Sequence, residues 1–104
     1  MKAAQINSYG GIDVLKVNEN ASEPTPKEGQ ILVEVYAAGI NPFDMKMREG
    51  YVKDMMPKTF PITLGGDFAG RVVKEEGEFK AGDEVFGSAL VLGGASGSFA
   101  QKAT

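Results

Sequence analysis

The 104-residue sequence contains no cysteine and no histidine. Disulfide bonds are therefore excluded, and so are zinc, haem and iron-sulfur sites that need thiolate or imidazole ligands. Nucleophilic catalysis by a Ser-His or Cys-His pair is excluded for the same reason. A site built from carboxylates alone is still possible, but no group of acidic residues has the spacing of a calcium-binding loop.

Long apolar runs and clusters of basic residues are also missing. No segment approaches the ~20 apolar residues of a membrane span, and the N-terminal MKAAQINSYGG lacks the apolar core of a signal peptide. The formal net charge is -3. This argues against nucleic acid or an anionic membrane as a partner, because either binds through clustered positive charge. We expect a cytoplasmic protein.

Composition and length predict one globular domain over residues 1–104. Hydrophobic residues make up 42% of the chain and charged residues 24%, which are ordinary proportions for a soluble domain. A chain of this length buries roughly 65% of its extended surface on folding. A single hydrophobic core is therefore expected.

The stretch from Ala37 to Gly50 predicts a strand that leads into a short helix. Asn41 is a preferred N-cap residue, and Pro42 suits the first helical position. Gly50 can take the left-handed conformation that ends a helix. A polar side chain is thus placed at the end of a strand, directly before a helix N-terminus.

Two interpretations of Asn41 follow from its neighbours. Asn41 and Asp44 have the spacing of a capping box, in which each side chain satisfies a backbone donor of the other. Alternatively, Asn41 offers its amide to a ligand while Asp44 holds Arg48 or a loop, since Asp44 and Arg48 are spaced to pair on one helix face. One asparagine can serve both roles, because its amide has donors and an acceptor to share.

Short strands separated by regular turns make up most of the remaining pattern. The alternation is clearest from Ile31 to Ala38, where Ile31, Val33, Val35 and Ala37 share one face. Other strands are expected over residues 2–6, 14–17, 62–74, 84–86 and 99–103. We predict an all-β (mainly β) fold, either a β-barrel or a sandwich.

Three glycines, Gly65, Gly66 and Gly70, interrupt one of these strands. Glycine inside a strand indicates a bend, a bulge or a close backbone approach, and we expect Asp67 between them to accept backbone hydrogen bonds. Tyr51, just past the helix, fits either a packed ring with a satisfied hydroxyl or a proton donor.

The segment from Leu90 to Gly97 has a superficial likeness to the phosphate-binding turn of a dinucleotide fold. Its glycines do not fit G-x-G-x-x-G, and only seven residues follow Gly97. That is too few for the crossover helix and second strand that such a site needs. We assign no phosphate site there.

Six short motifs occur in a characteristic order: MKA at 1–3, VEVYAAGINPFD at 33–44, REGY at 48–51, PITLGGDFAG at 61–70, AGDEVFG at 81–87 and GSFA at 97–100. With them the sequence resembles the N-terminal, GroES-like catalytic domain of medium-chain dehydrogenase/reductases. Within that family it is similar to the zinc-independent quinone oxidoreductase (zeta-crystallin-like) branch. The resemblance covers essentially the whole chain and implies a partly open β-barrel with one or two short helices.

Departures from the zinc-containing members of the family concern their metal ligands. Those enzymes have a cysteine where this chain has Asn41, and G-H-E where it has Gly65-Gly66-Asp67. Phe43 stands where the zinc alcohol dehydrogenases place a proton-relay hydroxyl. The resemblance therefore implies a site without zinc and without that relay.

The activity implied by the resemblance is hydride transfer from NADPH to a quinone or to an activated C=C or carbonyl substrate. Asn41, Asp44 and Tyr51 are the implied catalytic residues: Asn41 lines the nicotinamide and substrate pocket, Asp44 braces it, and Tyr51 closes over the substrate or donates a hydrogen bond. Asn41 and Pro42 are the implied cofactor-binding residues. Without a metal, the substrate must be polarised by hydrogen-bond donors.

The family's Rossmann cofactor domain has no counterpart in residues 1–104. The resemblance implies that this C-terminal domain is the chain's partner, that it binds most of the NADPH, and that the parent enzyme is a homodimer. We expect the 104-residue domain to be inactive by itself. The alternative is a stand-alone GroES-like binding or assembly module without catalysis.

Overall fold

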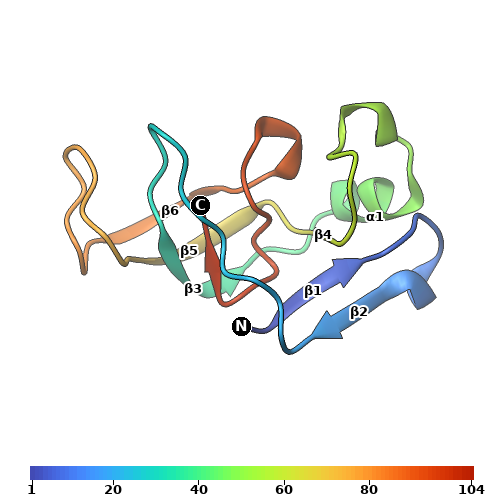
Figure 1. Ribbon diagram of the computed structural model, residues 1–104, viewed down its shortest axis with the longest axis horizontal. Coiled ribbons are helices and arrows are strands. Elements are labelled where there is room, and N and C mark those ends of the chain that lie inside the picture. Colours follow the sequence, from blue (N-terminus) through green and yellow to red (C-terminus); the bar gives the residue numbers. More distant parts are fainter.

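A computed structural model describes residues 1–104 and shows two open antiparallel sheets and one α-helix (Figure 1). The first sheet has the order β2-β1-β4. The second has the order β6-β5-β3-β7. The strands are β1 (Ala3–Ile6), β2 (Leu15–Asn18), β3 (Val33–Ala38), β4 (Ile62–Thr63), β5 (Asp67–Val72), β6 (Glu84–Ser88) and β7 (Lys102–Ala103). The prediction of a mainly β fold is confirmed, with open sheets that do not close into a barrel.

The helices are short. They are α1 (Pro42–Glu49) and the 3-10 turns η1 (Ile12–Val14), η2 (Lys53–Met55) and η3 (Val91–Gly93). None is long and apolar enough to cross a membrane. The bounds of α1 agree with the prediction from its caps: Asn41 is extended at the N-cap, and Gly50 has a φ of 92° at the C-cap.

Buried apolar side chains from α1, the first sheet and η3 form the main core. Met47 on α1 and Ile6 on β1 have no exposed surface at all. The buried members of this cluster are Ile6, Met47, Met56, Ile62, Leu64 and Val91. Packing against the first sheet and η3 holds α1 in place, because an eight-residue helix has little stability of its own.

A β-bulge in β3 alters the predicted alternation of faces. The pairing with β5 shifts register between Val35 and Ala37, so Tyr36 is left over in the ladder. Val33 is buried, as expected for the inner face, but Ala37 is exposed. The prediction that Val33 and Ala37 lie on one face is therefore wrong, because an extra residue in one strand reverses the faces beyond it.

The close backbone approach predicted for the glycine-rich strand is confirmed at Gly70. A Cβ atom built on Gly70 would lie against the main-chain carbonyl oxygen of Glu34 on β3. Gly65 has a φ of 97°, which favours glycine for a different reason. Glycine at position 70 therefore allows β5 to pack closely against β3.

The segment just before β7 lies beside the start of β1. Figure 1 shows the two regions. The Ala4 N–H donates to the Phe99 carbonyl at 2.7 Å, and the Gln101 N–H donates to the Lys2 carbonyl at 3.1 Å. The segment that carries β7 therefore ties the first sheet to the second.

Candidate active site

Polar side chains gather where β3 ends and α1 begins. Asn41 follows the last residues of β3, and Asp67 is the first residue of β5. The Nδ2 group of Asn41 donates to Oδ2 of Asp67 at 3.0 Å. The Gly39 N–H donates to the Asp67 carbonyl at 3.0 Å, which keeps the two strand ends together. Asn41 is thus held by a neighbouring strand as well as by its own helix.

The Asp44 carboxylate caps the helix from inside. It accepts the Asn41 backbone N–H at 2.7 Å, and the Asp44 N–H donates to the Asn41 carbonyl at 2.9 Å. Both halves of the predicted capping box are present at Asn41 and Asp44, so that prediction is confirmed. The amide nitrogen of Asn41 also donates to Asp67.

The predicted pair of Asp44 and Arg48 does not form. The single ion pair of Arg48 is with Glu49, at 3.8 Å, and its buried Nε atom has no hydrogen-bond partner. Helical spacing brought the two side chains to one face, but the Asp44 carboxylate turns back to the helix N-terminus, where a backbone donor needs an acceptor. Asp44 braces Asn41 and does not hold Arg48.

Burial of Asp44 affects the pKa of its carboxyl group. The Asp44 residue is only 6% exposed, and this burial raises the pKa of its carboxyl above the ordinary value of 3.8. The hydrogen bond from the Asn41 N–H opposes this change, and the negative charge of Asp67 adds to it. No lysine or arginine forms an ion pair with either carboxylate. The site has a negative character.

Replacing Asp44 by asparagine should change the pH dependence of stability. The raised pKa means that the folded protein holds this proton more tightly than the unfolded chain, so Asp44 lowers stability progressively as pH rises from about 4 to the folded-state pKa. We expect Asp44→Asn to gain stability relative to the parent chain between pH 4 and pH 7, measured by urea midpoints at each pH. A constant difference across this range would contradict the prediction.

The structure also tests the predicted surroundings of Asp67 and Tyr51. Asp67 accepts a side-chain amide and not the expected backbone donors, so that prediction is wrong in its partner. Tyr51 is 73% exposed, so the packed-ring interpretation is wrong as well. Its role as a proton donor stays a prediction. Ile40, 85% exposed beside Asn41, was not singled out by any pattern in the sequence.

Metal binding has no basis in this arrangement. No group of three or more histidine, cysteine, aspartate or glutamate side chains lies close enough to hold a metal ion. Asp44 and Asp67 both bind Asn41, one through its backbone and the other through its side chain. We therefore derive no chemical step through a metal, and the zinc independence of the parent enzyme stays a prediction.

The same groups fit one end of a nicotinamide cofactor. The Asn41 carboxamide offers an acceptor oxygen and one N–H that is not directed to Asp67, which matches a neutral carboxamide. The two carboxylates do not suit phosphates, which need cations or a cradle of backbone N–H groups. A neutral carboxamide would therefore suit the Asn41 side chain better than a phosphate would.

Comparisons with known proteins show the family of this chain. Residues 27–104 match the family model described as the alcohol dehydrogenase GroES-like domain. The chain is 44% identical over 89 residues to the chloroplastic NADPH-dependent alkenal/one oxidoreductase of Arabidopsis thaliana, covering 83% of this chain and 23% of that protein. It is 37% identical over 99 residues to the quinone oxidoreductase of Homo sapiens, covering 90% and 29%.

A solved structure shows the same fold. The Escherichia coli quinone oxidoreductase complexed with NADPH aligns with a TM-score of 0.79 and 29% identity, covering 98% of this chain and 30% of that one. The chain thus spans less than a third of each of these three relatives. This chain belongs to the alcohol dehydrogenase GroES-like domain family, within the quinone oxidoreductase-like medium-chain dehydrogenase/reductases.

Proposed function

We propose that this chain is the substrate-side domain of an NADPH-dependent oxidoreductase that reduces a quinone or an activated C=C or carbonyl substrate. The observation that carries the proposal is Asn41, whose backbone is held by Asp44 at 2.7 Å and whose side chain is held by Asp67 at 3.0 Å. Two anchors fix the carboxamide in place before any ligand binds. Such preorganisation is what positioning and polarising a substrate require.

Each residue of the site has a part in this proposal. Asn41 contacts the nicotinamide and the substrate, and Pro42 beside it completes the wall at the helix start. Asp44 is a positioning residue, because it is buried and its carboxylate accepts the Asn41 backbone N–H. Tyr51, with an exposed ring, closes over the substrate or donates a hydrogen bond. NADPH, when bound, supplies the hydride.

The proposal includes a larger parent protein. The three relatives compared are more than three times the length of this chain, and the negative site offers nothing to phosphates. A Rossmann domain elsewhere in the polypeptide would hold most of the NADPH, and the isolated 104-residue chain would be inactive. We further propose a zinc-independent, cytoplasmic enzyme that is a homodimer through its other domain.

The test compares this chain with one that continues to the end of its reading frame. We expect the longer protein to bind NADPH in a fluorescence titration and to oxidise it when a quinone or an enone is added. The 104-residue chain should do neither. If no longer reading frame exists and the short chain forms a defined assembly indifferent to NADPH, the proposal fails and a binding module without catalysis is favoured.

A further inference from the structure

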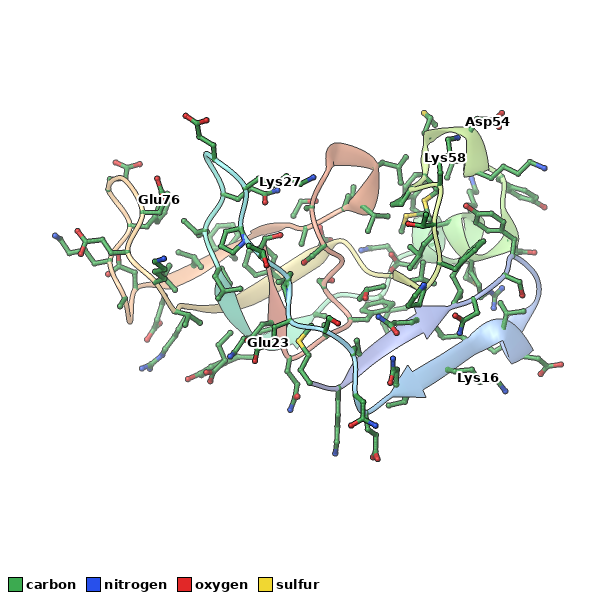
Figure 2. All side chains as sticks on the ribbon, viewed as in Figure 1. Lys16, Glu23, Lys27, Asp54, Lys58 and Glu76 are labelled. Atoms are coloured by element: carbon green, nitrogen blue, oxygen red, sulfur yellow. The ribbon has the colours of Figure 1, made fainter.

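Arg48 on α1 is a charged side chain that the fold buries without an acceptor. Most charged residues of the chain are exposed, and Figure 2 shows two of them, Lys16 and Glu76, extending from the ribbon into solvent. Among the charged residues only Asp44 and Arg48 are buried. The Asp44 carboxylate accepts the Asn41 N–H, so its burial is accompanied by a hydrogen bond. The burial of Arg48 has no such compensation.

The contacts of the Arg48 guanidinium leave its donors unused. A guanidinium has five N–H donors in a planar fork, yet the buried Nε atom of Arg48 has no hydrogen-bond partner. Its one ion pair joins Nη2 to Oε1 of Glu49 at 3.8 Å, which is too long for a hydrogen bond. The Glu49 side chain is 42% exposed, so water competes for that carboxylate. Glu49 therefore compensates the buried charge poorly.

A buried, unpaired guanidinium calls for an anion. Burying a charge is unfavourable unless the charge is paired and hydrogen-bonded, and arginine does not escape this cost by losing its proton. The C-terminal end of α1 attracts cations, but it attracts the exposed Lys46 of the same turn as well. A carboxylate suits the Arg48 side chain best, because its two oxygens match the guanidinium fork with two parallel hydrogen bonds.

The surroundings of Arg48 favour an attached carboxylate over a dissolved anion. Arg48 lines none of the three larger hollows of the surface, so a free anion would meet one cation and no enclosing walls. A carboxylate on the same polypeptide needs no enclosure, because its effective concentration is high. The relatives compared are more than three times the length of this chain, so a parent of that length has many further residues to supply one.

We propose that Arg48 binds an aspartate or glutamate carboxylate in the part of the parent polypeptide outside residues 1–104. The Gly10 N–H donates to the Arg48 carbonyl at 3.0 Å, so the backbone at this position is already held. The ion pair would fix α1, and with it Asn41 at the start of the helix, relative to the rest of the enzyme. This inference rests on the proposed parent enzyme and adds the contact through which it holds the helix of the site.

Arg48→Met, made in the 104-residue chain and in the longer protein, tests the pairing. In the short chain it removes an unpaired buried charge, so the melting temperature should stay equal or rise. In the longer protein it leaves the partner carboxylate unpaired, so the melting temperature should fall by several degrees. Lys46→Met is the matched control, because it removes the same charge from the last turn of α1 but from an exposed side chain. Its small effect should be the same at both lengths.

The guanidinium itself reports its acceptor in an NMR experiment. The Nε–H proton of Arg48, assigned by its loss in Arg48→Met, should exchange with water roughly tenfold more slowly in the longer protein than in the short chain. Millimolar acetate should not stabilise the short chain. Stabilisation by acetate that Arg48→Met abolishes would assign Arg48 to a free anion and overturn the proposal.

The two proposals can fail separately. If the longer protein oxidises NADPH but Arg48→Met leaves its melting temperature unchanged, this inference is wrong and the proposed function stands. If Arg48→Met lowers the melting temperature of a longer protein that does not oxidise NADPH, the carboxylate pair stands and the proposed function is wrong.

Discussion

Gly70→Ala is expected to destabilise the domain by roughly 3 kcal/mol or more, a large part of the total stability of a small protein. The added methyl group would meet the Glu34 carbonyl oxygen and the Val33 side chain on β3. A clash with main-chain atoms cannot be relieved by a rotamer change, so β3 and β5 would have to separate. Chemical denaturation followed by circular dichroism gives the loss directly.

Gly87→Ala is the matched control for this prediction. Gly87 also lies in a strand of the same sheet, but a Cβ atom there would find the Phe68 ring at 3.6 Å, an ordinary contact distance. We expect its stability to stay within about 1 kcal/mol of the parent chain. Equal losses in the two variants would show that the close approach at Gly70 is not the cause.

Asn41→Ala in the longer enzyme should lower kcat/KM by roughly 100-fold, the scale of losing one preorganised hydrogen-bonding group. It should also destabilise the domain by about 1 kcal/mol, because Asn41 is the N-cap residue of α1. The measurement is quinone-dependent oxidation of NADPH by purified enzyme, together with a thermal melt to show that the fold is retained.

Two comparisons make the Asn41 result specific. Met45→Ala alters an exposed residue of the same helix, 52% accessible, and should leave turnover unchanged. Asp67→Ala removes the side-chain anchor and should lower kcat more than it changes KM, because Asn41 is still present but less well oriented. Full activity of Asn41→Ala would remove this residue from the site and leave it a structural role only.

The helix could be predicted from local sequence because its signals are local. Asn41, Pro42 and Gly50 each act within one turn, and both bounds of α1 follow from them. The bulge at Tyr36 could not be predicted from the sequence in the same way. A bulge is defined by the pairing of two strands, and the sequence of one strand does not reveal its partner's register. The alternation rule therefore failed where β3 approaches the site.

The candidate site was predictable in part. Asn41 and Asp44 were found from spacing, whereas Asp67 lies 26 residues from Asn41, and no periodicity connects them. The expected Asp44–Arg48 pair failed because a backbone donor competed for the same carboxylate. The exposure of Tyr51 depends on how the segment after α1 folds, which spacing cannot reveal.

The contact between the segment before β7 and the start of β1 has a consequence for how the protein forms. Ala4 finds its acceptor at Phe99, so this early strand makes the contact only after the segment around Phe99 has been made. During synthesis at ~5–20 residues per second, that delay lasts for several seconds. Contacts so distant in sequence also slow folding. The connection between the first and the second sheet therefore forms only after the segment that carries β7 has been made.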